Sequence, residues 1–125
     1  TRQPLNIKSN RYISKPYNGL IENYLEKVDA TINGGGLIKY ETSFCGIPSA
    51  SLSTTNKQHE DTLLLEKQGL LYNLGNQQNE IKINIENRIN NFINNPKIRK
   101  TISNNGINFF TPKSVNNLIN KIYEL

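Results

Sequence analysis

The sequence Asp29-Ala-Thr-Ile-Asn-Gly-Gly-Gly-Leu-Ile-Lys-Tyr-Glu41, followed shortly by Gly46-Ile-Pro-Ser-Ala-Ser-Leu-Ser53, decides the fold of this chain. It predicts a short buried strand over 30–32, a turn of three glycines, a helix over 37–45 and a second strand over 47–54. A strand that leads through glycines into a helix is typical of a place where phosphate is held. Backbone N–H groups at the start of the helix point outward, and the missing side chains let an anion approach.

The rest of the chain keeps the same alternation of helices and strands. We expect helices over 18–27, 58–68, 81–93 and 96–103, a last helix after Thr111, and a third strand over 70–74. The pattern predicts one α/β domain over residues 1–125, with a Rossmann-like parallel sheet flanked by helices. Ligands bind at the carboxyl ends of the strands in such sheets, which here are 33–36, 54–58 and 74–75.

The apolar residues of the helix over 37–45 are expected to pack it onto the sheet. These residues are Leu37, Ile38, Tyr40, Phe44 and Cys45. Cys45 is therefore expected to be buried. As the single cysteine, it excludes an internal disulfide and is compatible with a reducing compartment.

Composition and charge narrow the classes of partner. A net charge of +5 fits an anionic ligand such as a nucleotide. The charges are scattered and have no aromatic residues between them, so we expect no nucleic-acid partner. We find no apolar run of transmembrane length and no signal peptide, and we expect a cytoplasmic protein. Because the chain contains no Met, we expect a fragment that starts after the natural N-terminus.

Glu41 is the acidic residue in the first turns of the predicted helix after the glycines. A carboxylate repels phosphate but accepts hydrogen bonds from sugar hydroxyls. The glycines and Glu41 together predict a nucleotide or nucleotide-sugar site, whereas a lone helix glutamate is more commonly solvated.

Lys39 and Lys57 either lend charge to a diphosphate or are solvated, and His59 is expected to be exposed. No Cys/His cluster supports a metal site, and we expect no cofactor.

Several of these elements occur in an order that resembles the C-terminal domain of GT-B nucleotide-sugar enzymes. The likeness is to the UDP-sugar hydrolase of pseudaminic-acid synthesis, the spore-coat polysaccharide proteins and the transferase that adds N-acetylglucosamine to the peptidoglycan lipid precursor. It covers residues 16–76. The matching residues are Asp29, 30–32, Gly34–Gly36, Glu41, Gly46-Ile-Pro-Ser49, Asn56-Lys-Gln58, Leu65-Glu-Lys-Gln-Gly69 and 70–75.

This resemblance implies a nucleotide-sugar-binding half of a glycosyltransferase or UDP-sugar hydrolase in surface polysaccharide or nonulosonic-acid synthesis, with a UDP-sugar as ligand. The implied contacts are Gly34, Gly35 and Gly36 with the diphosphate, Glu41 with ribose hydroxyls, Tyr17 and Asn18 with the base, and Asn56 and Gln58 with the sugar or diphosphate. A missing N-terminal Rossmann-like domain or companion chain would supply the acceptor site and the catalytic base. The fragment alone is expected to be inactive.

The chain departs from the family pattern just after the glycines. Members often carry Ser or Thr there, whereas this chain has Leu37 and Ile38. At these positions only backbone groups are expected to contact phosphate. A non-catalytic scaffold that kept the fold without the site remains the main alternative, and a small basic nucleic-acid binder is a weaker one. The sugar, the acceptor and the choice between uracil and cytosine stay open.

Overall fold

The computed structural model describes residues 11–15, 19, 21–111, 113 and 120, and it has the predicted α/β class. Three parallel strands form one sheet in the order β1-β2-β3. They are β1 (Thr31–Asn33), β2 (Ser49–Ser53) and β3 (Tyr72–Asn76). The predicted site residues Tyr17 and Asn18 lie outside the described residues, as does almost all of the helix expected after Thr111.

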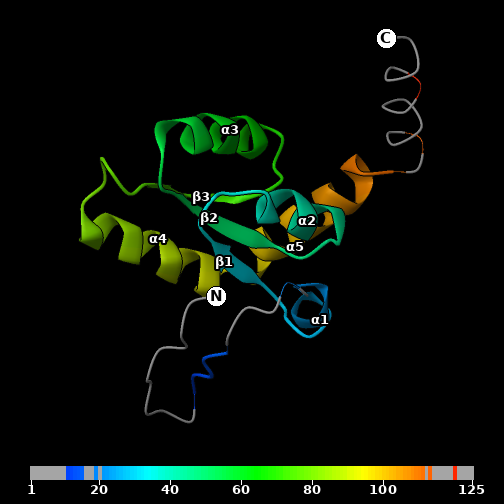
Figure 1. Ribbon diagram of the computed structural model, residues 1–125, viewed down its shortest axis with the longest axis horizontal. Coiled ribbons are helices and arrows are strands. Elements are labelled where there is room, and N and C mark those ends of the chain that lie inside the picture. Colours follow the sequence, from blue (N-terminus) through cyan, green and yellow to red (C-terminus); the bar gives the residue numbers. More distant parts are fainter. Residues whose placement is uncertain (1–10, 16–18, 20, 112, 114–119, 121–125) are drawn as a thin grey trace.

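The helices cover both faces of the sheet (Figure 1). They are α1 (Glu22–Leu25), α2 (Ile38–Phe44), α3 (Asn56–Lys67), α4 (Lys82–Asn94) and α5 (Pro96–Phe109). Right-handed crossovers between neighbouring parallel strands place α2 and α3 on the same face. Helices α4 and α5 pack on the other face, which gives a Rossmann-like three-layer arrangement. Within the described ranges, no helix is both long and apolar enough to cross a bilayer.

Helix α3 begins two residues earlier than the sequence pattern predicts. Thr55 has an extended backbone and caps the helix, because its hydroxyl accepts a hydrogen bond from the N–H of Gln58 at 3.2 Å. Asn56 and Gln58 therefore lie in the first turn of a helix rather than in a loop. Helix α5 likewise runs beyond the predicted end, through Gly106, which packs closely against the backbone of Ser43 on α2.

Strand β2 separates two chemically different layers, because side chains alternate between the faces of a strand. Ala50 and Leu52 face the apolar core that the sheet forms with α4 and α5. The buried members of this core are Ala50, Leu74, Phe92 and Ile102. The three serines of β2 face the other way and are fully buried. Ser51 donates to Asn33 Oδ1 at 2.7 Å, and Ser53 donates to Thr62 Oγ1 on α3 at 3.3 Å.

The sequence-based prediction for the packing face of α2 is wrong. The exposed residues of this helix include three that were expected to pack on the sheet, Leu37, Tyr40 and Phe44. Its buried residues are instead Lys39, Thr42 and Ser43. The surfaces around α2 are not apolar, because β2 carries buried serines and Ser43 lies against Gly106 of α5. Thr42 satisfies its own hydroxyl by donating to the carbonyl of Ile38 at 3.0 Å.

The apolar layer gives a direct test of the fold. Phe92 on α4 is 1% exposed and packs against Tyr72 of β3, with ring centroids 5.6 Å apart. We expect Phe92→Ala to lower the free energy of unfolding by about 3–5 kcal/mol through lost burial and a residual cavity. Its neighbour Ile93 is exposed, and Ile93→Ala is expected to change this free energy by less than about 0.5 kcal/mol. Urea denaturation of both variants measures the difference, and equal losses would contradict the assigned core.

Candidate functional site

The carboxyl ends of the three strands meet at one edge of the sheet. The register pairs Asn33 with Ser51, and Ser53 with Asn76, so each strand ends beside its neighbour. The N–H of Gln77, just after β3, donates to the carbonyl of Ser53 at 2.8 Å and ties these ends together. In parallel sheets this is the edge where ligands bind. We call it the carboxyl edge.

The glycine turn follows β1 and lies directly on β2. Gly35 is buried and has a φ of +78°, and a Cβ built there would lie 3.3 Å from Ser53 Cα. Its N–H donates to the Asn33 side chain at 3.2 Å. Nothing lies within 4 Å of a Cβ built at Gly34 or Gly36, and the side chain of Leu37 extends into solvent with the residue 77% exposed. The outer side of the turn is therefore open.

The side chain of Lys39 reaches back from the first turn of α2 to the glycine turn. Its ammonium donates to the carbonyl of Gly35 at 2.9 Å and to that of Gln58 at 3.5 Å. The residue is only 2% exposed. Burial lowers the pKa of Lys39, and the negative charge of Asp61 on α3 partly opposes that shift. The ammonium also lies 5.4 Å from the ring centroid of Tyr40. A buried cation thus connects the glycine turn to α3.

The amides predicted to contact a ligand lie in the first turn of α3. The Oε1 atom of Gln58 accepts from the backbone N–H of Thr54 at 3.0 Å and from its hydroxyl at 2.8 Å. Asn56 Oδ1 accepts from Asn76 Nδ2 at 2.8 Å. These contacts fix both carbonyl oxygens. Among the described residues, the amide nitrogens of Asn56 and Gln58 have no protein acceptor, so they remain able to donate to a ligand.

A cation from α4, Arg88, lies beside the end of β3, and its charge is paired with a carboxylate. Arg88 on α4 donates to the carbonyl of Leu74 at 3.0 Å and pairs with Glu80 at 3.1 Å. Hydrogen bonds from Arg88, and then from Asn84, lower the pKa of Glu80. Gly75 has a φ of +110°, and a Cβ at this position would lie 2.7 Å from the guanidinium. The glycine therefore makes room for this ion pair.

Glu41 lies on the exposed side of α2. It follows Lys39 by two residues, which places the two side chains on nearly opposite faces of the helix. No described contact joins its carboxylate to the glycine turn or to α3. The structure thus brings Gly35, Lys39 and Gln58 together and leaves Glu41 facing solvent.

Lys57, whose role the sequence left open, and His59, which was expected to be exposed, have distinct surroundings. The Lys57 side chain is exposed and pairs with Glu60 and Asp61 on its own helix, so it is a solvated residue. His59 was expected to be exposed, but it is half-buried, and its Nδ1 atom is buried without a protein partner among the described residues. The sequence analysis also missed Asn33 and Asn76. Their signal is a polar residue at the last position of a strand.

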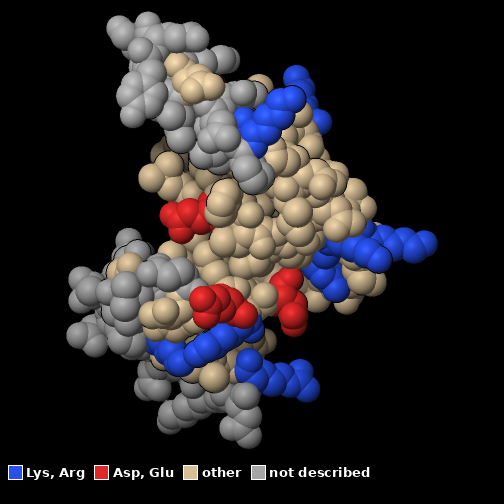
Figure 2. All heavy atoms as spheres, turned by 90° about the vertical axis from the view of Figure 1, so that its right-hand side faces the viewer, with Lys and Arg blue, Asp and Glu red and all other residues tan. Residues whose placement is uncertain are grey.

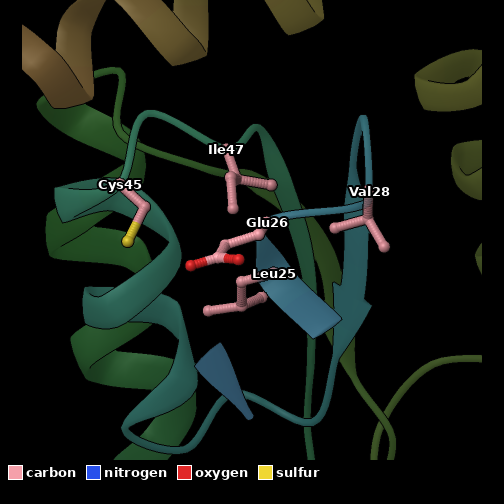
Figure 3. Close-up of a pocket in the computed structure, with 5 residues that line it drawn as sticks. All are labelled: Leu25, Glu26, Val28, Cys45 and Ile47. Carbon is pink, nitrogen blue, oxygen red and sulfur yellow. The ribbon is translucent and has the colours of Figure 1, made fainter. Parts of the chain in front are cut away.

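A hollow of about 410 Å³ lies at the opposite end of the sheet, beside the amino ends of β1 and β2 (Figure 3). Its lining residues are Leu25, Glu26, Val28, Cys45 and Ile47. The prediction that Cys45 is buried is wrong, because this residue lies just beyond α2 and is exposed. Figure 3 shows the carboxylate of Glu26 pointing toward the side of the hollow on which Cys45 lies. None of its lining residues lies at the carboxyl edge, so the hollow is separate from it.

Neither metal ligands nor relatives identify the site. In the part of the chain that the structure describes, no three His, Cys, Asp or Glu side chains gather in a way that could hold a metal ion. No family model matches the chain, and searches of curated proteins and of solved structures find no match. The structure shows the α/β fold class, and the GT-B resemblance of residues 16–76 stays a prediction.

The glycine turn gives a second test. Gly35→Ala would place a Cβ against Ser53 in a left-handed backbone conformation. We expect it to lower the free energy of unfolding by about 1–3 kcal/mol. Gly36 has neither restriction, so Gly36→Ala is expected to change this free energy by less than about 1 kcal/mol. Thermal unfolding of the two variants checks this. A loss in Gly36→Ala as large as that in Gly35→Ala would contradict the described turn.

Proposed function

We propose that this chain is the nucleotide-sugar-binding half of a glycosyltransferase or UDP-sugar hydrolase. The observation that carries the proposal is the meeting of the glycine turn with the first turn of α3. Gln58 Oε1 lies 3.7 Å from the position that a Cβ of Gly35 would occupy, although the two residues are far apart in sequence. Two segments rich in hydrogen-bond donors thus share one open edge, where parallel sheets bind ligands.

The proposed ligand is a UDP-sugar whose diphosphate lies over the open side of the glycine turn. Backbone donors there, together with the amide nitrogens of Asn56 and Gln58, would bind the phosphate and sugar oxygens. Glu41 would accept hydrogen bonds from the ribose hydroxyls. The resemblance of residues 16–76 to the GT-B family supports this assignment of roles.

The proposed chemistry is displacement at the anomeric carbon or at the glycosyl–phosphate bond, with this half binding the nucleotide that leaves. Negative charge grows on the diphosphate as that bond breaks, and fixed donors at the carboxyl edge would stabilise it. We propose that a second Rossmann-like domain, covalently attached or in a companion chain, supplies the acceptor site and the base. The cytoplasmic synthesis of a surface polysaccharide or nonulosonic acid is the setting that the resemblance implies.

Glu41 allows a direct test of the ligand class. We expect Glu41→Ala to weaken the binding of UDP-N-acetylglucosamine by about 1–3 kcal/mol, because the ribose hydroxyls lose their acceptor. The exposed Glu86 on α4 pairs with Lys82 at 3.7 Å, so Glu86→Ala is a matched control and is expected to bind normally. Calorimetric titration measures all three proteins. Unchanged affinity in Glu41→Ala would reject its role, and a wild-type protein that does not respond to UDP-sugars would reject the proposed function.

A second candidate function is a non-catalytic scaffold. It is favoured by the exposed apolar side chains of α2, which are Leu37, Tyr40 and Phe44. Figure 2 looks onto the side of the molecule that carries α2 and shows a broad uncharged area bordered by acidic and basic side chains. Such a surface suits contact with another protein. Absence of UDP binding both with and without the second domain would favour this alternative.

A further inference from the structure

We infer that Lys39 supplies the buried positive charge of a diphosphate site at the carboxyl edge, acting on the ligand through the glycine turn rather than by direct contact. The identity of the ligand as a nucleoside diphosphate rests on the proposed function. The role of Lys39 as a positioning residue for an anion rests on the surroundings of its ammonium.

The partners of this ammonium are poor compensation for its burial. Removing a charged amine from water is costly unless a carboxylate or a full set of hydrogen bonds replaces the water. Lys39 is 2% exposed, and its two hydrogen-bond partners are neutral carbonyls, those of Gly35 at 2.9 Å and Gln58 at 3.5 Å. The ring of Tyr40, whose centroid lies 5.4 Å from the ammonium, is a further favourable partner but carries no charge. Its lowered pKa is the direct result of this burial. The unliganded protein therefore holds a positive charge that its surroundings disfavour.

Other cations near the carboxyl edge differ from Lys39, because their charges are balanced. Arg88 pairs with Glu80 at 3.1 Å, and Lys57 pairs with Asp61 at 3.5 Å. Among the described residues, no carboxylate lies within ion-pair distance of Lys39. Asp61 raises its pKa from farther away while pairing with Lys57. The charge of Lys39 thus remains available to an anion from outside the chain.

Burial disfavours the positive charge of Lys39, and its position at a helix end disfavours that charge further. Its ammonium lies beside the first turn of α3, because it donates to the carbonyl of Gln58. The dipole of this helix places partial positive charge at that end, which disfavours a cation and favours an anion. A diphosphate over the open side of the glycine turn would relieve both the dipole repulsion and the uncompensated burial. The gain increases with the negative charge of the ligand, so Lys39 should distinguish a diphosphate from an uncharged nucleoside.

The test compares ligands of different charge in three proteins. They are the wild type, Lys39→Met, which keeps the length of the side chain, and Lys82→Met, which removes an exposed lysine on α4. Inorganic pyrophosphate, UDP and uridine are titrated by calorimetry.

We expect Lys39→Met to weaken pyrophosphate and UDP binding by about tenfold and uridine binding by less than about twofold, because only the charged ligands interact with the lost charge. Lys82→Met is expected to match the wild type. A role limited to pinning the turn would instead weaken UDP and uridine equally, which would overturn the inference.

A measurement on the wild type keeps the inference testable even where Lys39→Met fails to fold. A bound anion must raise the pKa of a nearby ammonium, since the coupling between anion and proton is reciprocal. We expect pyrophosphate to raise the pKa of Lys39, followed by NMR of the lysine Cε signals, and to leave that of Lys82 unchanged. An unchanged pKa for Lys39 under saturating pyrophosphate, or the absence of pyrophosphate binding, would overturn the inference.

The same data separate this inference from the proposed function. Binding of pyrophosphate that depends on Lys39, without binding of UDP or UDP-N-acetylglucosamine, would reject the proposed function and support the buried charge. Equal binding of UDP-N-acetylglucosamine by the wild type and Lys39→Met, with no loss for pyrophosphate, would support the function and overturn the role of Lys39.

Discussion

The alternation of serine with apolar residues along β2 is the constraint on which the rest of this structure depends. Ala50 and Leu52 direct one face of the strand into the apolar core, and the serines line the opposite face. Small polar side chains allow α2 and α3 to approach the sheet closely. This approach lets Gly35 lie against Ser53 and lets the ammonium of Lys39 reach two backbone carbonyls. The carboxyl edge is therefore a product of the polar layer rather than of the apolar one.

The sequence was sufficient to predict the fold class and the order of the elements, but not the face by which α2 packs. Strands, glycines and helical periods are local signals, and β1, α2, β2 and α4 formed within about two residues of their expected positions. Strand β3 begins and ends two residues later than predicted, α1 is shorter than the helix expected over 18–27, and α5 ends six residues later than predicted. The packing face was wrong because hydrophobic periodicity assumes an apolar partner surface. Here β2 carries buried serines and Ser43 lies against Gly106 of α5, so small polar residues of α2 face inward while Phe44 is 57% exposed. That choice depends on a tertiary contact and cannot be read from either segment alone.

In the candidate site, too, some features could be predicted from the sequence and others depend on tertiary contacts. Parallel strands end at a common edge, so the proximity of Gly35 and Gln58 could be predicted from topology. The burial of Lys39 could not, because it requires the glycine turn, α2 and α3 to meet around one side chain. The start of α3 did have a local signal, because Thr55 is a typical N-cap residue. Glu41 is exposed, and its assigned role rests on resemblance and general chemistry.

The serine-lined layer also affects how stability varies with temperature. Several buried polar atoms in or beside it lack protein partners among the described residues, including the hydroxyls of Thr31, Ser43 and Ser49. Unfolding would expose these groups to water together with the apolar core. Hydration of apolar surface raises the heat capacity of the unfolded chain, whereas hydration of polar surface lowers it. The heat capacity change of unfolding is therefore expected to be small for a chain of this length. A small change makes the curve of the free energy of unfolding against temperature broader and flatter.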